Sequence, residues 1–546
     1  MNLALPSPIL TLRLAGGDRL LPLTPGVSLL DMLVNAGFAV PSGCGGGGKC
    51  GLCRVRVLEG EAMPAGPEEQ ARLSAAEREE GLRLSCRCHP LSPLTVALDA
   101  AAADPCWRLL AAAELPPVAV LPIEGGGKGL GLAIDIGTTQ LRLSLWDLAA
   151  GRRLCAVTGG NPQSAYGADI LTRLMMAGRS PETAARLQEL VVDAVAGGVE
   201  HLAGAAGVAP GEIVSVQAVG NTAMLSLLSG RNSLSLLEPD NWTRRVECAP
   251  AAPAALAASW RLAPEARISL VPALGGFVGS DLLAGILTTG LDRGPGGSLL
   301  IDFGTNSEMA LWDGETLFAA AAAGGPAFEG CGISCGMPGE KGAIYRVRSG
   351  PGEALSGEVL GGGEALGICG SGLVDVMACL RRSGGLDRVG RLRGPVRDGV
   401  ALGEAVFLSA GDIDVFQRAK AAIGAGIEWL CARAGMNPAE LRRVVACGAF
   451  GRVLDPENAG EIGLLPRLAP GVALELEGNA ALGGAERLLF SAPDMPELAA
   501  LLAHTRLFNL GEDPEFEILF IENLYIQPIR ERASRADAAL EDNHLG

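Results

Sequence analysis

The chain has 546 residues and is 48% hydrophobic, which is enough to bury the cores of about two to four domains. Its net charge of −17 argues against a nucleic-acid-binding protein, because such proteins carry basic patches that neutralise phosphates. The sequence has neither an apolar run of about 18 residues nor an N-terminal secretory signal. We therefore expect a cytoplasmic protein whose 14 cysteines are reduced.

The first hundred residues predict a small β-grasp-like domain. Residues 9–14 and 19–23 alternate in polarity as two paired strands do, and apolar residues at helical spacing predict a helix over 27–37. Residues 54–60 and 94–99 are typical of further strands. A short sheet with one helix is the expected result.

A cysteine-rich loop follows the predicted helix and reads "CGGGGKCGLC". Cys44, Cys50 and Cys53 have the spacing C-x5-C-x2-C, and Cys86 lies farther along the chain. The plant-type 2Fe–2S pattern is C-x4-C-x2-C with a distant fourth cysteine, so one extra residue stands in the first gap. Glycine lets such a loop turn through positive φ and bring its N–H groups close to sulfides. We interpret the loop as a 2Fe–2S site, with Cys86 preferred as fourth ligand and Cys88 as the alternative.

A structural zinc site and uncoordinated thiols are the competing interpretations of these cysteines. Zinc sites usually show two short cysteine or histidine pairs, whereas this sequence has one tight trio and a distant fourth cysteine. Residues 5–99 resemble plant-type ferredoxin domains, which implies a one-electron carrier of low potential. We place the ferredoxin-like domain at 1–99. Residues 100–128, rich in alanine, proline and glycine, are expected to form a linker that contains a short helix.

An internal repeat marks the rest of the chain. Residues 131–148 and 298–314 each contain an apolar strand, a D-x-G-T-[TN] turn and a second strand. Such turns offer backbone N–H groups and short polar side chains to phosphate oxygens, and the aspartates can hold Mg²⁺ directly or through water. Two facing turns would grip the phosphates of a nucleotide. The predicted residues are Asp135, Gly137, Thr138 and Thr139 in one turn and Asp302, Gly304, Thr305 and Asn306 in the other.

Two more glycine-rich turns complete the pattern. The first follows an apolar strand and suits an adenosine pocket, where backbone must pass close to a flat ring. The second precedes a helix, so its amides could face phosphate or ribose. The first turn consists of Gly448, Ala449, Phe450 and Gly451, and the second contains Gly370, Ser371 and Gly372.

These turns together resemble the actin, sugar-kinase and Hsp70 (ASKHA) superfamily. The resemblance implies a two-lobed ATPase built from RNase H-like repeats. The fold class expected for the whole chain is therefore multidomain, with a β-grasp ferredoxin-like domain followed by an α/β ATPase. We place the first lobe at 129–293, the second lobe with the adenosine motif at 294–530, and a mobile tail at 531–546.

A ferredoxin-like domain fused to such an ATPase resembles the reductive activators of corrinoid proteins. The resemblance extends over about residues 5–528 and includes the segments 159–174, 218–230, 325–344 and 461–466. It implies an ATP-dependent enzyme that passes one electron from a 2Fe–2S cluster to an inactive cobalt(II) corrinoid and restores cobalt(I). The implied cofactors are the cluster, ATP and Mg²⁺. The implied partners are a corrinoid protein of a methyltransferase system and an external low-potential electron donor, without nucleic acid or membrane; a homodimer is left open.

Roles in catalysis are assigned to Asp135, Asp302 and Glu308. Glu308 is within reach of the second turn and could orient water, and a surface or strand-pairing role is its alternative. Cys331 and Cys335 could indicate a second cluster. We do not favour it, because the N-terminal cysteines already account for one cluster. Three other functions stay open: electron donation to another low-potential enzyme, a small-molecule kinase with a regulatory cluster, and a binding protein with slow turnover.

Overall fold

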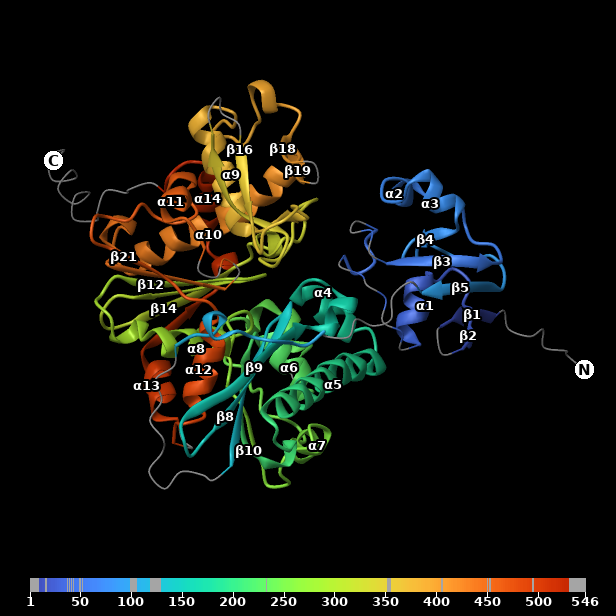
Figure 1. The fold of residues 1–546 in the computed structure, drawn as a ribbon, viewed down its shortest axis with the longest axis horizontal. Helices are drawn as coiled ribbons and strands as arrows, with labels where there is room; N and C mark the ends of the chain where they lie inside the picture. Colours follow the sequence, from blue (N-terminus) through green and yellow to red (C-terminus); the bar gives the residue numbers. More distant parts are fainter. Residues whose placement is uncertain are drawn as a thin grey trace, which may run out of the picture.

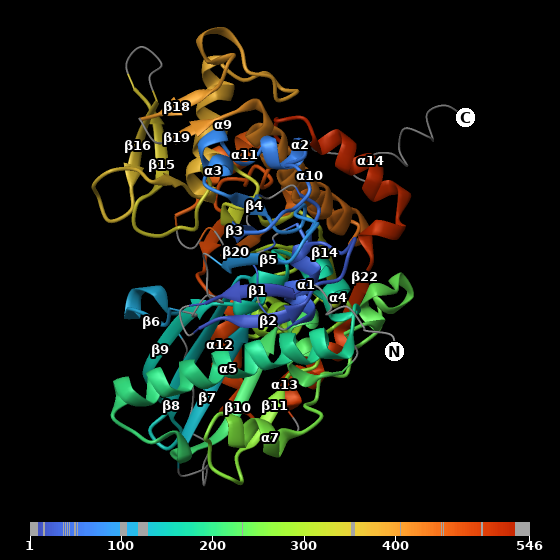
Figure 2. The same ribbon diagram turned by 90° about the vertical axis from the view of Figure 1, so that its right-hand side faces the viewer.

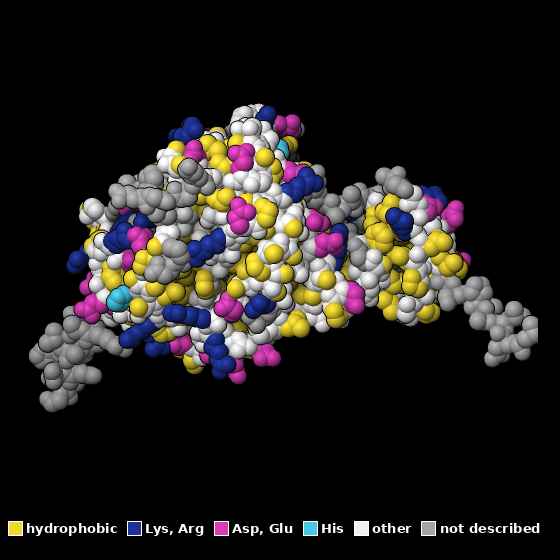
Figure 3. Space-filling model, turned by 90° about the horizontal axis from the view of Figure 1, so that it is seen from below, with side chains coloured by type: hydrophobic (Ala, Val, Ile, Leu, Met, Phe, Trp, Pro, Cys, Tyr) yellow, Lys and Arg dark blue, Asp and Glu magenta, His cyan; other side chains and the backbone are white. Residues whose placement is uncertain are grey.

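The computed structural model describes the chain as three bodies, shown in Figure 1: an N-terminal domain and two lobes, each built on its own sheet. Figure 3 shows the N-terminal domain as a separate body beside the lobes, with acidic and basic side chains interspersed over the face in view. The described residues are 9–14, 17–36, 38, 40, 42, 44–48, 51, 53–98, 106–117, 129–231, 233–350, 355–403, 406–448, 450, 453–492 and 495–529.

The N-terminal domain is a mixed five-stranded sheet in the order β2-β1-β5-β3-β4, packed against one main helix. Helix α1 begins after Ser28, whose side chain accepts from the backbone N–H of Asp31, and it buries its leucines against the sheet. This arrangement confirms the predicted β-grasp fold. The elements are β1 (Ile9–Arg13), β2 (Arg19–Pro22), α1 (Leu29–Asn35), β3 (Arg54–Glu59), α2 (Pro67–Gln70), α3 (Ala75–Glu79), β4 (Leu82–Leu84) and β5 (Leu94–Leu98).

The two lobes contain sheets of the same design. In each sheet three consecutive strands pair antiparallel, and two later strands add in parallel beside the first of them. The first sheet has the order β11-β10-β7-β8-β9-β6 and the second β21-β20-β12-β13-β14-β22. The repeat found in the sequence is therefore a repeat of architecture. The strands are β6 (Arg108–Leu109), β7 (Leu130–Ile136), β8 (Gln140–Asp147), β9 (Arg152–Gly160), β10 (Ile213–Gly220), β11 (Arg267–Leu270), β12 (Ser298–Phe303), β13 (Ser307–Trp312), β14 (Leu317–Ala322), β20 (Arg443–Gly448), β21 (Ala473–Leu476) and β22 (Thr505–Phe508).

Helices cover both sheets, and two of them join the lobes. Helices α8 and α12 pack on each other in a core that contains residues of both sheets. Arg153 of β9 forms an ion pair with the fully buried Glu486 of α12, which fixes that helix to the first lobe. The helices are α4 (Ile170–Ala177), α5 (Pro181–Ala206), α6 (Thr222–Ser229), α7 (Pro253–Ser259), α8 (Ser280–Thr289), α9 (Gly370–Ser383), α10 (Ala410–Arg433), α11 (Pro456–Ile462), α12 (Ala480–Leu488), α13 (Pro496–His504) and α14 (Pro514–Asn523).

Two small sheets stand on the second lobe, at the top of Figure 1. One contains β15 (Ala343–Ser349), β16 (Leu355–Val359) and β17 (Gly367–Ile368). The other is the hairpin of β18 (Val400–Leu402) and β19 (Val406–Leu408). In the described part of the chain, no helix is both long enough and apolar enough to cross a bilayer.

The expected linker differs from the prediction over its described residues, 106–117. Strand β6 joins the edge of the first-lobe sheet by pairing with β9, and the short helix within this stretch is the 3₁₀ helix Ala112–Glu114. The physical reason is Trp107, whose ring lies so close to α5 that a Cβ at Gly198 would be 2.8 Å from it. The predicted tail at 531–546 lies outside the described residues.

The N-terminal domain contacts the first lobe through helix α1, which also approaches α5, and through the cysteine loop. Asp31 of α1 forms an ion pair with Arg179, which follows α4. Gly45 of the cysteine loop lies against α4, where a Cβ added to this glycine would be 2.8 Å from Cγ2 of Thr172. Figures 1 and 2 both show α4 and α5 as the part of the lobe that faces this domain.

Candidate functional site

The cysteine loop brings two of its predicted ligands together. The Sγ atoms of Cys53 and Cys86 are 3.4 Å apart, and both residues are buried. Two thiolates on one tetrahedral metal, each about 2.3 Å from it, lie roughly 3.8 Å apart, so this pair fits a shared iron. Cys50 lies outside the described residues, and among the described Cys, His, Asp and Glu side chains no three are close enough to hold a metal ion.

The hydrogen bond between the two thiols changes their pKa values in a way that favours metal binding. The hydrogen bond with Cys86 lowers the pKa of Cys53 to about 6, and the same bond raises the pKa of Cys86. One member of the pair is therefore a thiolate near neutral pH, which is the form that binds metal. Cys44 is partly buried, and its charge also acts on Cys86.

Glycine is required in this loop by its backbone conformation. Gly45, Gly46, Gly48 and Gly51 have φ angles of 58°, 90°, 75° and 71°, in the region that side chains with a Cβ rarely adopt. Arg87 connects the loop to the segment that contains Cys86 and Cys88, because its guanidinium donates to the Gly47 carbonyl at 2.8 Å.

Cys88 has a different environment from Cys86. It is fully buried beside the ion pair of Arg83 and Glu69, whose charged atoms are 2.8 Å apart. Burial raises the pKa of the Cys88 thiol to about 11. Cys88 therefore lies in the core of the domain, whereas Cys86 lies beside Cys53.

The two predicted phosphate turns have the expected strand–turn–strand geometry. In the first, the Gly137 N–H donates to the Gln140 carbonyl at 3.0 Å, and a Cβ at Gly137 would lie 2.6 Å from that oxygen. Asn161 supports this turn by donating from its side chain to the Gly137 carbonyl at 2.9 Å. Thr138, its neighbour in the turn, is buried. Residues Gly304, Thr305 and Asn306 connect β12 to β13 in the second turn.

Carboxylates gather at the ends of the strands that carry these turns. Asp135 accepts from Asn479 at 2.5 Å and lies 3.7 Å from Arg142. Asp302 and Glu308 face each other across β12 and β13. Asp281 lies in the first turn of the nearby helix α8. The cluster contains Asp135, Asp281, Asp302 and Glu308.

Burial raises the pKa of every member of this carboxylate cluster, and mutual repulsion adds to the rise for Asp281, Asp302 and Glu308. Burial is the larger cause for Asp281 and Asp302, whose pKa values rise to about 7, and neighbouring carboxylates raise them further. The pKa of Glu308 is raised well above its usual range by the same two causes. A divalent cation would relieve this repulsion, and Mg²⁺ is commonly held by one or two carboxylates together with water and phosphate.

The surface interpretation of Glu308 is wrong, because the residue is only 4% exposed. Its side chain accepts from the Gly279 N–H at 3.3 Å, at the start of α8. The strand-pairing interpretation agrees with the structure, since Glu308 is the cross-strand partner of Asp302. Glu308 thus belongs to the carboxylate cluster of the nucleotide turns.

The glycine-rich turn at the start of α9 is closely packed. A Cβ at Gly370 would lie 2.5 Å from the Phe328 carbonyl, and one at Gly372 would lie 2.4 Å from the Ile344 carbonyl. Ser371 donates to the Tyr345 carbonyl at 2.7 Å. These contacts hold α9 against its neighbours and leave no described contact to the phosphate turns.

The predicted adenosine turn is described at two positions. The Phe450 ring packs edge-on against Phe303 in the core, with 4.7 Å between ring centres, so it supports the turn from below. Gly448 has a φ of 85°, and a Cβ there would lie 2.3 Å from Oδ1 of Asp302. Gly448 therefore lets this turn approach the second phosphate turn. Ala449 and Gly451 lie outside the described residues.

Sequence reasoning missed two residues of the site, Asp281 and Glu329. Asp281 follows a glycine and a serine at the start of α8, a pattern that could have indicated a helix N-terminus facing a ligand. Glu329 is at the end of a 3₁₀ helix, and its Oε2 accepts from Thr305 at 2.6 Å and from Thr139 at 3.4 Å. No local pattern predicts the second contact, which joins residues 190 positions apart.

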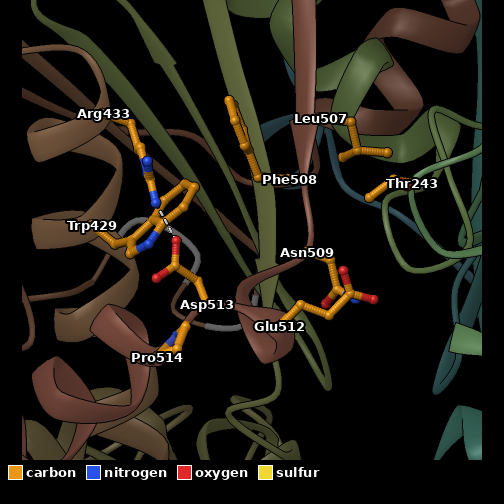
Figure 4. Close-up of a pocket in the computed structure, with 9 residues that line it drawn as sticks. All are labelled: Thr243, Trp429, Arg433, Leu507, Phe508, Asn509, Glu512, Asp513 and Pro514. Atoms are coloured by element: carbon orange, nitrogen blue, oxygen red, sulfur yellow. Dashed lines mark hydrogen bonds and ion pairs between the residues drawn. The ribbon is translucent and has the colours of Figure 1, made fainter. Parts of the chain in front are cut away.

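A cavity of about 400 Å³ lies away from these turns, between α10, β22 and the start of α14 (Figure 4). The guanidinium of Arg433 lies 4.7 Å from the centre of the Trp429 ring and pairs with Asp513. The charge that could have bound an anion is therefore already neutralised. Cys331 and Cys335 lie elsewhere, and Cys335 donates to the Phe407 carbonyl at 3.3 Å.

The fold and the site define a ferredoxin-type domain joined to a two-lobed ASKHA nucleotide-binding domain. Residues 13–91 match the sequence profile of the "2Fe-2S iron-sulfur cluster binding domain". Residues 130–294 match the "RACo middle region", and residues 297–535 match the "C-terminal domain of RACo the ASKHA domain". The predicted fold class is thereby confirmed.

Known proteins match most of the chain. It is 31% identical over 425 residues to the corrinoid activation enzyme RamQ of Eubacterium limosum, covering 72% of this chain and 70% of that protein. It is 29% identical over 393 residues to the [Co(II) methylated amine-specific corrinoid protein] reductase of Methanosarcina barkeri, covering 66% and 69%. A solved structure, the "Reductive activator for corrinoid,iron-sulfur protein", aligns with a TM-score of 0.65 at 26% identity over 96% of this chain and 99% of that one. The chain belongs to the family of corrinoid activation enzymes.

We predict that Cys86→Ser loses most of the bound iron and that Cys88→Ser keeps it. Cys86 lies 3.4 Å from a second thiol, whereas Cys88 faces the Arg83–Glu69 pair in the core. Iron content and the visible spectrum of anaerobically prepared protein measure the difference. Equal iron loss in both variants, with both still folded by circular dichroism, would contradict the assignment of Cys86 as the fourth ligand.

We predict that Asp281→Asn makes the stability of the nucleotide-free protein less dependent on pH. Because the pKa of Asp281 is raised in the folded protein, the native state binds more protons than the unfolded state between about pH 4 and 7. Stability should therefore fall as pH rises through this window, by on the order of 1 kcal/mol per pH unit for this group. The measurement is the denaturant midpoint of the lobes at pH 5, 6, 7 and 8. Identical slopes in wild type and variant would contradict the prediction.

Proposed function

We propose that the protein is an ATP-dependent reductive activator that transfers one electron to the inactive cobalt(II) corrinoid of a methyltransferase-system protein and restores cobalt(I). One observation carries this proposal: a thiol loop suited to a 2Fe–2S cluster and two phosphate turns occur in one chain, which aligns over 96% of its length with a reductive activator. The relatives RamQ and the Methanosarcina reductase are named for activity on corrinoid proteins.

The proposed cluster ligands and nucleotide residues follow from the geometry of the site. A 2Fe–2S cluster held by four cysteines supplies a single electron at low potential. Asp135 and Asp302 hold Mg²⁺, largely through water, and the cluster of carboxylates around them keeps the site attractive to a cation. The proposed cluster ligands are Cys44, Cys50, Cys53 and Cys86; the proposed phosphate contacts are Gly137, Thr138, Thr139, Gly304, Thr305 and Asn306; the proposed nucleoside contacts are in the backbone of residues 448–451.

An ATPase makes physical sense beside this electron carrier. The cobalt(II)/cobalt(I) couple is expected to lie below the potential of a ferredoxin-type cluster, so the transfer is uphill. A deficit of about 100 mV costs about 2.3 kcal/mol for one electron. This cost falls within the usual range of allosteric coupling energies, about 1–3 kcal/mol. A nucleotide-dependent difference in how tightly the two redox states of the partner bind could therefore supply it.

The proposed partners are a corrinoid protein and an external low-potential reductant that reloads the cluster. We place the protein in the cytoplasm, a reducing compartment in which cysteine ligands stay available for iron. Neither nucleic acid nor a membrane is part of the proposal. The net charge of −17 disfavours binding to nucleic-acid phosphates.

The direct test is anaerobic reduction of a cobalt(II) corrinoid protein, followed by its visible absorbance. The purified activator should contain about two irons per chain. With a chemical reductant present, ATP should accelerate appearance of the cobalt(I) spectrum. Iron-free protein, or equal rates with and without ATP for every corrinoid protein tried, would reject the proposed function. ATP-dependent phosphorylation of a small molecule would instead favour a kinase.

We predict that Asp302→Ala lowers the ATP-stimulated rate of cobalt reduction, on the order of tenfold or more, and leaves the spectrum of the 2Fe–2S cluster unchanged. The substitution removes a carboxylate of the proposed Mg²⁺ site, in a lobe that does not contribute cysteine ligands. The converse variant, Cys50→Ser, should abolish electron transfer and keep ATP binding. Loss of the visible spectrum in Asp302→Ala would contradict this division of labour.

A further inference from the structure

Glu329 connects the two nucleotide turns. It lies at the end of the 3₁₀ helix Pro326–Glu329 in the second lobe. Its Oε2 accepts from the hydroxyl of Thr305, in the turn of its own lobe, at 2.6 Å. The same oxygen lies 3.4 Å from the hydroxyl of Thr139, in the turn of the first lobe. One carboxylate oxygen therefore bridges the two lobes at the point where they face each other.

A carboxylate oxygen and a phosphate oxygen are chemically equivalent partners for these hydroxyls, since both are anionic acceptors. The hydroxyls that Glu329 occupies belong to the turns assigned to ATP phosphates. Two anions cannot share this position without strong repulsion, particularly in a buried site. Terminal phosphate and Glu329 therefore compete for Thr139 and Thr305.

A second buried group offers the displaced carboxylate a partner. Arg173 of α4 has no exposed surface; its Nε donates to the Gly167 carbonyl at 2.8 Å and its Nη1 to Met224 Sδ at 3.2 Å. Its Nη2 is buried without a hydrogen-bond partner among the described residues. A guanidinium buried in this way is costly unless an anion is close.

Two carboxylates act on the charge of Arg173, those of Asp169 and Glu329. Asp169 is already engaged in capping α4: it accepts from the Thr172 N–H at 2.9 Å and from the Thr172 hydroxyl at 2.7 Å. Glu329 is therefore the carboxylate that can change partners.

We propose that Glu329 is a phosphate-displaced switch between the two lobes, an inference that rests on the proposed ATP site. Without nucleotide, its carboxylate joins the Thr139 and Thr305 hydroxyls. When the terminal phosphate of ATP takes those hydroxyls, the carboxylate moves to the unpartnered N–H group of Arg173. ADP lacks the terminal phosphate and leaves the bridge in place.

Helix α4, which carries Arg173, also contacts the cysteine loop. Arg173 is buried in the first lobe. The residue before it on α4, Thr172, faces Gly45 of the cysteine loop: a Cβ added to Gly45 would lie 2.8 Å from Cγ2 of Thr172. An ion pair formed at Arg173 acts on the same helical turn that touches the loop. In this proposal, ATP binding changes the partner of Arg173, and Arg173 is adjacent in sequence to the residue that contacts the cysteine loop.

The first test is nucleotide affinity in Glu329→Gln, an isosteric variant that removes the competing charge. We expect ATP to bind more tightly, on the order of tenfold, with little change for ADP. Binding is measured by calorimetry on the full-length, cluster-loaded protein with Mg²⁺ present. The matched control is Glu315→Gln, an exposed glutamate in the β13–β14 connection, which should change neither affinity.

The second test follows the signal to the cluster. ATP should change the electron paramagnetic resonance spectrum of the reduced wild-type protein, and Glu329→Gln should abolish the difference between the ATP and ADP spectra. Thr172→Ser keeps the hydroxyl that bonds Asp169 and removes the methyl group that faces Gly45. It should bind ATP normally and show a smaller spectral change.

The outcomes separate the switch from other roles of Glu329. Weaker ATP binding in Glu329→Gln would make the residue a ligand of the nucleotide site and overturn the switch. Unchanged ATP affinity with a lower hydrolysis rate would make it a water-orienting residue and also overturn it. Failure of wild-type protein to bind ATP would instead reject the proposed function, whatever the variants do.

Discussion

The site depends on repulsion among buried carboxylates at the junction of the two lobes. Asp135, Asp281, Asp302 and Glu308 come from different strands and a helix. Burial raises the pKa of each, and neighbouring carboxylates raise those of Asp281, Asp302 and Glu308 further. Such a cluster is unfavourable in a folded protein unless protons or a cation compensate it. The lobes are held together around it by the apolar packing of α8 and α12 and by the buried Arg153–Glu486 pair. The fold thus maintains a concentration of buried carboxyl groups at this junction.

The repeated sheet explains how this concentration of charge arises. In each lobe the first strand ends in an aspartate and turns sharply into its antiparallel neighbour, and a parallel strand lies beside it. The two copies face each other, so two turns and two aspartates converge without any long loop. Gly137 and Gly448 are needed for close approach, since a Cβ at either would lie within 2.6 Å of a neighbouring oxygen. Rigid elements therefore position most of the site.

Features carried by contiguous residues could be predicted from the sequence. The cysteine spacing and the two D-x-G-T-[TN] turns depend on short segments, and the β-grasp strands and the repeated lobes follow from them. Glu329 and Arg173 could not be found in this way, because their roles depend on contacts between distant segments. Thr139 and Glu329, for example, are 190 residues apart.

The same distinction explains the linker and the adenosine turn. Trp107 docks on α5, and this contact turns a stretch with linker composition into the edge strand β6. The sequence motif predicts that Phe450 contacts the nucleoside. In the structure its ring packs against Phe303 and Phe328 in the core. Composition and motif spacing do not show whether a side chain packs against the rest of the protein or is available to a ligand.

The contact between Asp31 and Arg179 has a consequence for how the ferredoxin-type domain is held on the first lobe. Both side chains are more than a third exposed, and an exposed ion pair of this kind stabilises an interface by about 0–1 kcal/mol and is weakened by salt. This ion pair therefore adds little to the contact between the ferredoxin-type domain and the lobes, so the remaining contacts of α1 and the cysteine loop must hold the domain in place. Salt should weaken this ion pair, and hence the hold of α1 on the first lobe, before it affects the buried Arg153–Glu486 pair between β9 and α12.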